Sequence, residues 1–146
     1  LGVVQRIPAS DLHLSYRHNG AAKDLIFTQA YFVINKTATK TEIAAKIGEL
    51  KQKREAAQPQ GVRSCGSAFK NPPTPPSAGK LIEDAGFKGV NHLGAVMSLK
   101  HANFLVNENA SSALALEELG EMVRKKVYDD TGIMLEWEIK IIGEKA

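Results

Sequence analysis

Cysteine and tryptophan occur once each in this sequence of 146 residues, and long apolar runs are absent. Because Cys65 has no second cysteine with which to form a disulfide in the chain, we expect a reducing, cytoplasmic compartment. No apolar run approaches the ~20 residues that a membrane-spanning helix needs. The chain also does not open on the basic and then apolar pattern of a signal peptide. These absences favour a cytoplasmic globular domain.

Residue spacings typical of metal and dinucleotide sites are missing as well. The histidines and Cys65 do not form the close pairs of zinc sites, so no metal site is predicted. Gly86, Gly89 and Gly94 have the wrong spacing for a dinucleotide-binding fingerprint and would follow a helix rather than a strand. SAGKL resembles the end of a phosphate loop, but Thr74 stands where the first glycine should be.

Positive charge is in modest excess, with a formal net charge of +3. Basic clusters at 51–54 and 124–126 lie on expected helices, where solvated faces are the simplest interpretation. A basic domain can attract phosphates, either in nucleic acid or in a nucleotide ligand. Aromatic residues make up only 6% and form no stacking motif, so a nucleic-acid-binding domain without catalytic activity is the alternative rather than the main hypothesis.

Three helices are expected from capping residues and apolar periodicity. The first begins after Thr39 or Thr41, a short one covers 78–85, and a long one runs from Ser111 or Ser112 to Gly132. Apolar residues at helical spacing mark the buried faces of the two longer helices: Ile43, Ile47 and Leu50 in the first, and Leu116, Leu119, Val123 and Val127 in the last.

Strands are expected at 3–7, 25–35, near 95–98, near 103–107 and at 133–142. The 25–35 segment is apolar on both alternating faces, which indicates a strand covered on two sides. We therefore expect an α+β fold in which a small mixed sheet packs with two longer helices and one short helix. In the closing strand, one face should hold Ile133, Leu135, Trp137, Ile139 and Ile141, and the other Met134, Glu136, Glu138 and Lys140.

The stretch RSCGSAFKNP, residues 63–72, is too polar for a core. It lies in the proline-rich segment 58–77, whose length indicates a functional loop. Its Ser67 is sterically open between glycine and alanine, although a turn residue is the simpler interpretation. Cys65 could be a nucleophile, but a lone cysteine is more often inert.

Two further side chains are candidates for chemistry. Arg17 follows Tyr16 in a polar loop, where its guanidinium could clamp a carboxylate with two parallel hydrogen bonds. Glu138 lies near the end of the closing strand, where an exposed carboxylate without function is the simpler interpretation.

Four collinear motifs carry a resemblance to a known family. They are SYRHNG, GSAFKNPPTPPSAGKLIEDAGFKG, LGAVMSLKHANFLVN and GIMLEWEIKIIGE. Together they resemble the C-terminal, substrate-binding part of the UDP-N-acetylenolpyruvoylglucosamine reductase family of peptidoglycan synthesis. The resemblance places the end of the flavin-domain segment at residues 1–20 and the substrate-binding domain at 21–146. It also implies that the N-terminal FAD-binding half is absent from this chain.

The resemblance implies a reaction as well. The family reduces UDP-N-acetylglucosamine enolpyruvate to UDP-N-acetylmuramate. NADPH reduces FAD, and hydride then reaches the terminal vinyl carbon of the substrate. This chain is therefore expected to bind no FAD tightly and to be inactive alone. The expected partners are the enolpyruvyl substrate and the FAD-binding domain of the same protein, with no nucleic acid and no membrane.

The same resemblance assigns three catalytic residues. Arg17 would hold the substrate carboxylate, and Ser67 would protonate the carbanion that hydride addition leaves. Glu138 would stabilise the developing anion and is expected to work protonated or to share a proton, because a charged carboxylate would repel it. Glu136 lies on the same face and is an alternative by composition. The family motif selects Glu138.

Substrate contacts are assigned to Tyr16, Asn71 and Lys88. Lys88, or the amino end of the 78–85 helix, could hold the pyrophosphate. Four other polar residues fall in the matching motifs without an assigned role: Arg63, Lys70, His101 and Asn103.

Two other functions compete with this assignment. A serine hydrolase using Ser67 and His101 lacks a nucleophile elbow and an acidic partner. A degenerate domain kept only as a scaffold would show no effect of Ser67→Ala on the activity of the full-length protein.

Overall fold

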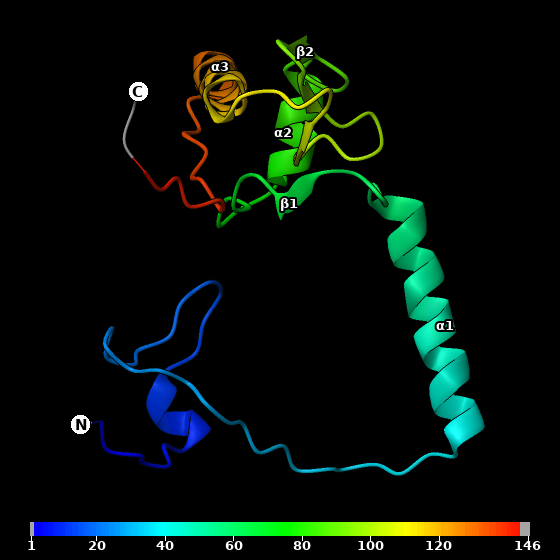
Figure 1. Ribbon diagram of the computed structural model, residues 1–146, viewed down its shortest axis with the longest axis vertical. Coiled ribbons are helices and arrows are strands. Elements are labelled where there is room, and N and C mark those ends of the chain that lie inside the picture. Colours follow the sequence, from blue (N-terminus) through cyan, green and yellow to red (C-terminus); the bar gives the residue numbers. More distant parts are fainter. Residues whose placement is uncertain (1, 144–146) are drawn as a thin grey trace. The chain divides into compact units, whose positions relative to one another are not determined.

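A computed structural model describes residues 2–143 and divides the chain into two compact units, Leu1–Ala38 and Thr39–Ala146 (Figure 1). The two units are described separately. The predicted boundary after residue 20 concerns the domains of a longer protein and stays a prediction.

The first unit contains a 3-10 helix, η1 (Ala9–Leu12), and a tight turn at Ser15–His18. The predicted strands at 3–7 and 25–35 are wrong for this structure, since neither segment is paired in a sheet. Ile26 and Phe32 are 86% and 88% exposed, respectively. A strand needs a neighbour to satisfy its backbone N–H and C=O groups, and the described residues of this unit do not provide one.

Helix α1 (Lys40–Ala57; Figure 1) begins after Thr39, one of the two predicted capping residues. The Thr39 hydroxyl accepts a hydrogen bond from the backbone N–H of Glu42, while the Glu42 carboxylate accepts one from the backbone N–H of Thr39, forming a capping box. The helix contains no buried residue. The expectation that this longer helix packs on the sheet is therefore wrong: its apolar side chains Ile43, Ile47 and Leu50 are all exposed.

The second unit holds a four-stranded sheet in the order β1-β4-β3-β2. Its strands are β1 (Ser64–Ser67), β2 (Asn91–His92), β3 (Ala95–Met97) and β4 (Phe104–Asn107). The α+β class is confirmed, but every pairing is antiparallel, so the sheet is not mixed. Short connections between β2, β3 and β4 suit antiparallel pairing, whereas a parallel pair needs a long crossover. Strand β1 also corrects the prediction that residues 58–77 form one long loop.

Helices α2 (Ala78–Asp84) and α3 (Ala113–Thr131) complete the second unit. Ser77 caps α2 and Ser112 caps α3, each accepting a hydrogen bond from a backbone N–H three residues later. The predicted end of α3 at Gly132 is confirmed, with a left-handed φ of 73° at that residue. None of the described helices has the length and apolarity to span a membrane.

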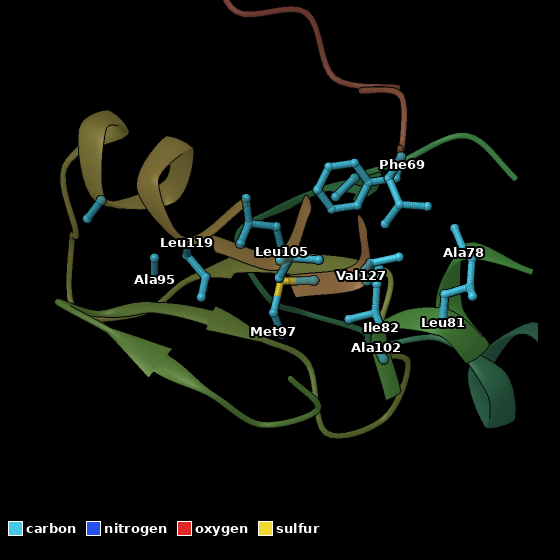
Figure 2. Close-up of a cluster of buried hydrophobic side chains, with 14 residues drawn as sticks. Phe69, Ala78, Leu81, Ile82, Ala95, Met97, Ala102, Leu105, Leu119 and Val127 are labelled. Atoms are coloured by element: carbon cyan, nitrogen blue, oxygen red, sulfur yellow. The ribbon is translucent and has the colours of Figure 1, made fainter. Parts of the chain in front are cut away.

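A single apolar core lies between α2, α3 and the sheet. Figure 2 shows Met97, Leu105 and Leu119 lying together in this cluster, with Phe69, Ile82 and Val127 also among its members. The predicted face of α3 is confirmed, since Leu119, Val123 and Val127 are fully buried.

The closing segment, residues 133–142, is not a regular strand. It makes one isolated bridge, between Trp137 and Phe69. The predicted alternation nevertheless holds through residue 139, because Leu135 is buried and Trp137 packs against the core. Ile141 was predicted on the same apolar face but is 55% exposed, so that prediction is wrong. Alternation reports which face is buried and does not require a full ladder.

Candidate active site

Tyr16 and Arg17 form the tip of a two-residue hairpin in the first unit. Ser15 and His18 exchange backbone hydrogen bonds of 3.0 and 3.1 Å around them. Arg17 has a φ of 58°, a left-handed conformation that is uncommon for residues other than glycine. The Arg17 guanidinium lies 5.1 Å from the centre of the Tyr16 ring. The hairpin thus presents an arginine where glycine or asparagine would be the easier choice, in a backbone conformation that His13, Leu93, Asn109 and Ala110 also adopt.

Ser67 lies at the end of β1, opposite Phe104 of β4, and is half-buried. The β1–β4 register is irregular between Ser64 and Ser67. Gly66 lies in this interval with a φ of 94°, which few residues other than glycine adopt. The irregularity therefore has a local cause and changes the direction of the strand directly before Ser67.

The chain after Ser67 is clamped by Asn103, which is 4% exposed. The Asn103 carbonyl accepts from the Ala68 N–H at 2.7 Å. Its side chain accepts from the Phe69 N–H at 2.9 Å and donates to the Phe69 carbonyl at 2.8 Å. The sequence motif included Asn103 without a role. Only the fold shows that it fixes the backbone next to Ser67.

Glu138 comes from the closing segment, and its backbone N–H donates to the Ala68 carbonyl at 2.8 Å. The fold therefore brings the backbones of two predicted catalytic positions, 67 and 138, side by side. Glu138 is half-buried. In contrast, the Glu136 side chain is 74% exposed and pairs with Lys70 at 3.1 Å. This difference supports Glu138 over Glu136, in agreement with the family motif.

Asn71 has a structural task in the described chain. Its side-chain oxygen accepts from the Ala78 N–H at 3.0 Å and so holds the proline-rich loop against the start of α2. The side-chain nitrogen of Asn71 is the group that remains to donate to a substrate.

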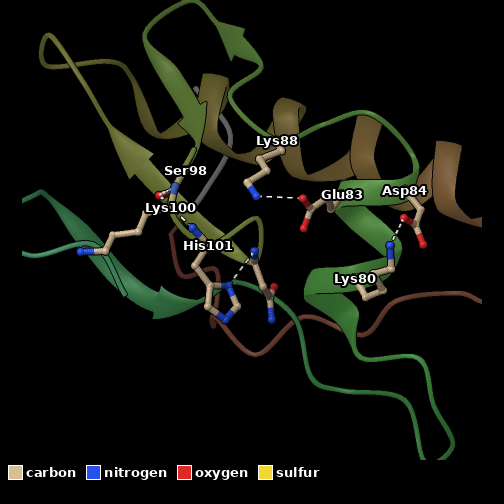
Figure 3. A network of polar contacts seen from close by, with 8 residues as sticks. Lys80, Glu83, Asp84, Lys88, Ser98, Lys100 and His101 are labelled. Carbon is tan, nitrogen blue, oxygen red and sulfur yellow. Dashed lines mark hydrogen bonds and ion pairs between the residues drawn. The ribbon is translucent and has the colours of Figure 1, made fainter. Parts of the chain in front are cut away.

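Lys88 lines a hollow of about 260 Å³ beside α2. Figure 3 shows its ammonium directed at Glu83, with a Nζ–Oε1 distance of 2.8 Å. This hydrogen bond lowers the pKa of Glu83, while the hydrogen bond of Lys80 to Asp84 raises the pKa of Lys80. Three lysines and one glutamate line the hollow, but Lys80 pairs with Asp84 and Lys88 with Glu83, so Lys100 accounts for the excess positive charge. The excess positive charge suits an anionic ligand such as a phosphate group. The full lining is Ser77, Gly79, Lys80, Glu83, Lys88, Lys100, His101 and Ala102.

A second hollow, of about 490 Å³, is lined by polar and apolar residues from the segment before β1 and from the end of β4 and the residues after it, among them Arg63, Asn107 and Asn109. Neither hollow contains a phenylalanine, tyrosine or tryptophan that could stack on an isoalloxazine ring. These two hollows do not fit FAD. Between residues 2 and 143 no group of three or more histidine, cysteine or carboxylate side chains is arranged to hold a metal ion.

The structure brings together some of the predicted site residues. The Glu138 backbone bonds to Ala68, the residue after Ser67, whereas Asn71 and Lys88 lie apart, at opposite ends of α2. Tyr16 and Arg17 belong to the other unit, so their approach to Ser67 stays a prediction.

Gly120 of α3 is a residue that sequence reasoning missed. A Cβ on Gly120 would lie 1.9 Å from the Trp137 ring. A glycine in the middle of a well-formed helix was the available signal, because such a glycine costs stability unless a close neighbour requires it.

Comparisons with known proteins identify the family to which this chain is related. Residues 58–142 match the family described as UDP-N-acetylenolpyruvoylglucosamine reductase, C-terminal domain. The UDP-N-acetylenolpyruvoylglucosamine reductase of Roseobacter denitrificans is 43% identical over 99% of this chain and 50% of its own length. That of Rhodopseudomonas palustris strain BisB5 is 47% identical over 92% of the chain and 43% of its own length. The chain thus spans about half the length of these curated relatives.

A crystal structure of the Thermus caldophilus UDP-N-acetylenolpyruvylglucosamine reductase (MurB) is also similar. It superimposes with a TM-score of 0.53 at 40% identity, covering 70% of this chain and 36% of that one. Sequence and fold agree on the same family over the residues that form the core. The chain therefore belongs to the UDP-N-acetylenolpyruvoylglucosamine reductase family, and its residues 58–142 correspond to the C-terminal domain of that family.

Proposed function

We propose that this chain is the substrate-binding and protonating part of a cytoplasmic reductase that converts UDP-N-acetylglucosamine enolpyruvate into UDP-N-acetylmuramate. The reaction would serve peptidoglycan synthesis, and through it cell shape and division. The observation that carries the proposal is the 2.8 Å hydrogen bond between the Glu138 N–H and the Ala68 carbonyl, which places the backbone of Glu138 beside the residue that follows Ser67.

The reduction adds a hydride and a proton across one carbon–carbon double bond. Hydride joins the terminal vinyl carbon, and the electron pair of the double bond moves to the adjacent carbon and into the substrate carboxylate. Ser67 Oγ–H then donates its proton to that adjacent carbon, which completes the lactyl ether. Positioned proton transfer is typically worth ~10²- to 10⁴-fold in rate.

The transient anion needs hydrogen-bond donors around its carboxylate. Arg17 suits this task because its guanidinium presents two parallel N–H groups. Glu138 suits it in the protonated form, in which its O–H can donate. Tyr16, next to Arg17 at the hairpin tip, is assigned to substrate binding.

The nucleotide part of the substrate carries a pyrophosphate. The basic hollow beside α2 supports a site for it, because Lys88 lines this hollow. Filling the hollow with an anion would change the surroundings of the Lys88–Glu83 pair, because both side chains line it.

FAD and NADPH supply the hydride in the chemistry that the family resemblance implies. The two hollows described above offer no aromatic side chain to stack on the flavin ring, and the chain spans about half the length of its relatives, so we assign both cofactors to the part of the longer protein that this chain does not span. The chain alone is then expected to bind substrate groups without turning over.

The test is Ser67→Ala in the full-length reductase. We expect turnover to fall ~10²- to 10⁴-fold, while reduction of the flavin by NADPH is retained, because only the proton donor is lost. Ser64→Ala is the matched control, since Ser64 lies on the same strand and is similarly half-buried. Wild-type turnover in Ser67→Ala would refute the assignment and favour a scaffold domain.

A further inference from the structure

The alignment of positions 67 and 138 depends on a very short backbone pairing. The Lys70 N–H donates to the Glu136 carbonyl at 2.9 Å, and the Glu138 N–H donates to the Ala68 carbonyl at 2.8 Å. Around them there is one isolated bridge rather than a ladder. A slip of one residue would turn every side chain of the closing segment to the opposite face. So few hydrogen bonds specify the register weakly, and side-chain contacts must select it.

Trp137 makes such contacts at the centre of the pairing. Its ring lies 4.6 Å from the ring of Phe69, the buried residue two positions after Ser67. Its indole N–H donates to Glu121 Oε1 at 2.9 Å. On α3, Gly120 leaves room for the ring, since a Cβ there would come within 1.9 Å of it. The indole ring therefore packs against Phe69, near the end of β1, and against Gly120 of α3.

The helix also holds the residues before Trp137. Arg124 donates from Nη1 to the Glu121 carboxylate at 2.7 and 2.8 Å, and from Nε to the Leu135 carbonyl at 2.9 Å. Glu121 thus accepts from both Trp137 and Arg124. One turn of α3 therefore holds the closing segment at Trp137 and at Leu135, which leaves the segment little freedom to slide.

We propose that Trp137 is a positioning residue for the protonation step. Its contacts with Phe69, Gly120 and Glu121 select the backbone register in which Glu138 lies beside the end of β1 that carries Ser67. This inference rests on the proposed function. In a slipped register, Glu136 or Glu138 would face the core and the indole would face solvent. Both changes are unfavourable, since burying an unpaired carboxylate and exposing a large aromatic ring each cost free energy.

The test uses Trp137→Phe and Trp137→Leu in the full-length reductase, with two rates measured separately. The first is reduction of the flavin by NADPH, and the second is its reoxidation by UDP-N-acetylglucosamine enolpyruvate. We expect the first rate to be unchanged. We expect the second to fall ~10²-fold in Trp137→Leu, as for a small misplacement of reacting groups. Trp137→Phe, which keeps a ring on Phe69 but loses the hydrogen bond to Glu121, should fall less.

Phe87→Leu is the matched control, because Phe87 is also an aromatic residue packed partly buried against the core. It should lower the thermal midpoint without slowing reoxidation. Wild-type reoxidation in a folded Trp137→Leu protein would overturn the proposal. So would an equal slowing in Phe87→Leu, since general destabilisation would then explain both.

Two further variants keep the outcomes distinct. If Trp137→Leu fails to fold, Trp137→Phe and Glu121→Ala decide, because both leave a ring against Phe69. Reoxidation at the wild-type rate in both would overturn the proposal.

If the Ser67→Ala protein reoxidises its flavin at the normal rate, the proposed function itself fails. If Ser67→Ala is inactive while the Trp137 variants react normally, only the positioning role fails.

Discussion

Residues 58–143 bury a continuous core, whereas none of the residues 2–57 is buried. The difference does not come from a lack of apolar residues, because eight of the ten residues 25–34 are apolar. It also does not come from weak helix signals, because α1 has a complete capping box. Local patterns can form a helix or a turn, but burial needs a second apolar surface. The stretch with a core is also the stretch that matches the family's C-terminal domain.

Hydrogen exchange should show the largest difference between the two regions. In this chain, amides of α3 should exchange at least ~10³-fold more slowly than amides of α1, because α3 opens only with the core and domain stabilities are ~5 kcal/mol or more. An isolated helix of the length of α1 is marginal in water. Mass spectrometry of peptides from the two helices measures the ratio. Equal protection would show that α1 has a partner surface that the fold does not explain.

Arg17→Ala should lower the turnover of the full-length reductase without lowering its stability. Arg17 lies in the region without a core, so the free energy of unfolding should hardly change. Turnover of the full-length reductase should fall ~10²- to 10³-fold, as for the loss of one donor to a developing anion. Arg6→Ala is the control: it removes another arginine of the same unit, which lies 4.2 Å from the centre of the Tyr31 ring. Similar turnover in both variants would remove Arg17 from the proposed site.

Gly120→Ala should test the packing of the core region. We expect a loss of about 1–3 kcal/mol in the free energy of unfolding, because the new Cβ would overlap the Trp137 ring. Gly48→Ala in α1 is the matched control, since no atom lies within 4 Å of its Cβ position. Alanine there should stabilise the helix by up to ~1 kcal/mol. Urea denaturation followed by far-UV circular dichroism compares the two, and an unchanged midpoint for Gly120→Ala would contradict the close contact.

The pH dependence of stability should show the smallest effect. Hydrogen bonds from lysines lower the pKa of Glu83 in α2 and of Glu49 in α1. Because each pKa is lower in the folded state, the stabilisation is present above the unfolded pKa and is lost as pH falls through the folded pKa. Glu83→Gln should therefore flatten the acid dependence of the core's urea midpoint slightly.

Glu49→Gln is the comparison for that experiment. It should leave the core midpoint unchanged at every pH, because α1 does not pack into the core. A larger effect from Glu49 than from Glu83 would reverse the distinction between the two regions.

Several elements followed directly from the sequence. Gly132 ends α3 as predicted, Ser112 is one of the two predicted caps at its start, and its apolar stripe is the face that is buried. These predictions succeeded because caps and helical periodicity act within a few residues. The predicted strand at 25–35 failed because its pattern reports burial in a sheet, and no partner strand lies among the described residues of its unit.

The candidate site, too, could be predicted from the sequence only in part. The motif around Ser67 could be identified from the sequence, but its place on a paired edge strand could not, since β1 lacks the usual apolar alternation. The choice of Glu138 over Glu136 rested on the family motif, and both carboxylates share one face of the alternation. The fold adds a physical difference: the Glu136 side chain is 74% exposed and pairs with Lys70, while Glu138 is half-buried.

The sequence by itself determined where the helices begin and end, which residues of α3 face inward, and which family's motifs the chain carries. These properties depend on interactions between neighbours along the chain. Only the tertiary structure decided that Lys70 pairs with Glu136, 66 positions away, and that Trp137 fits against Gly120. Such contacts depend on which distant segments bury their apolar faces together, and no local pattern contains that information.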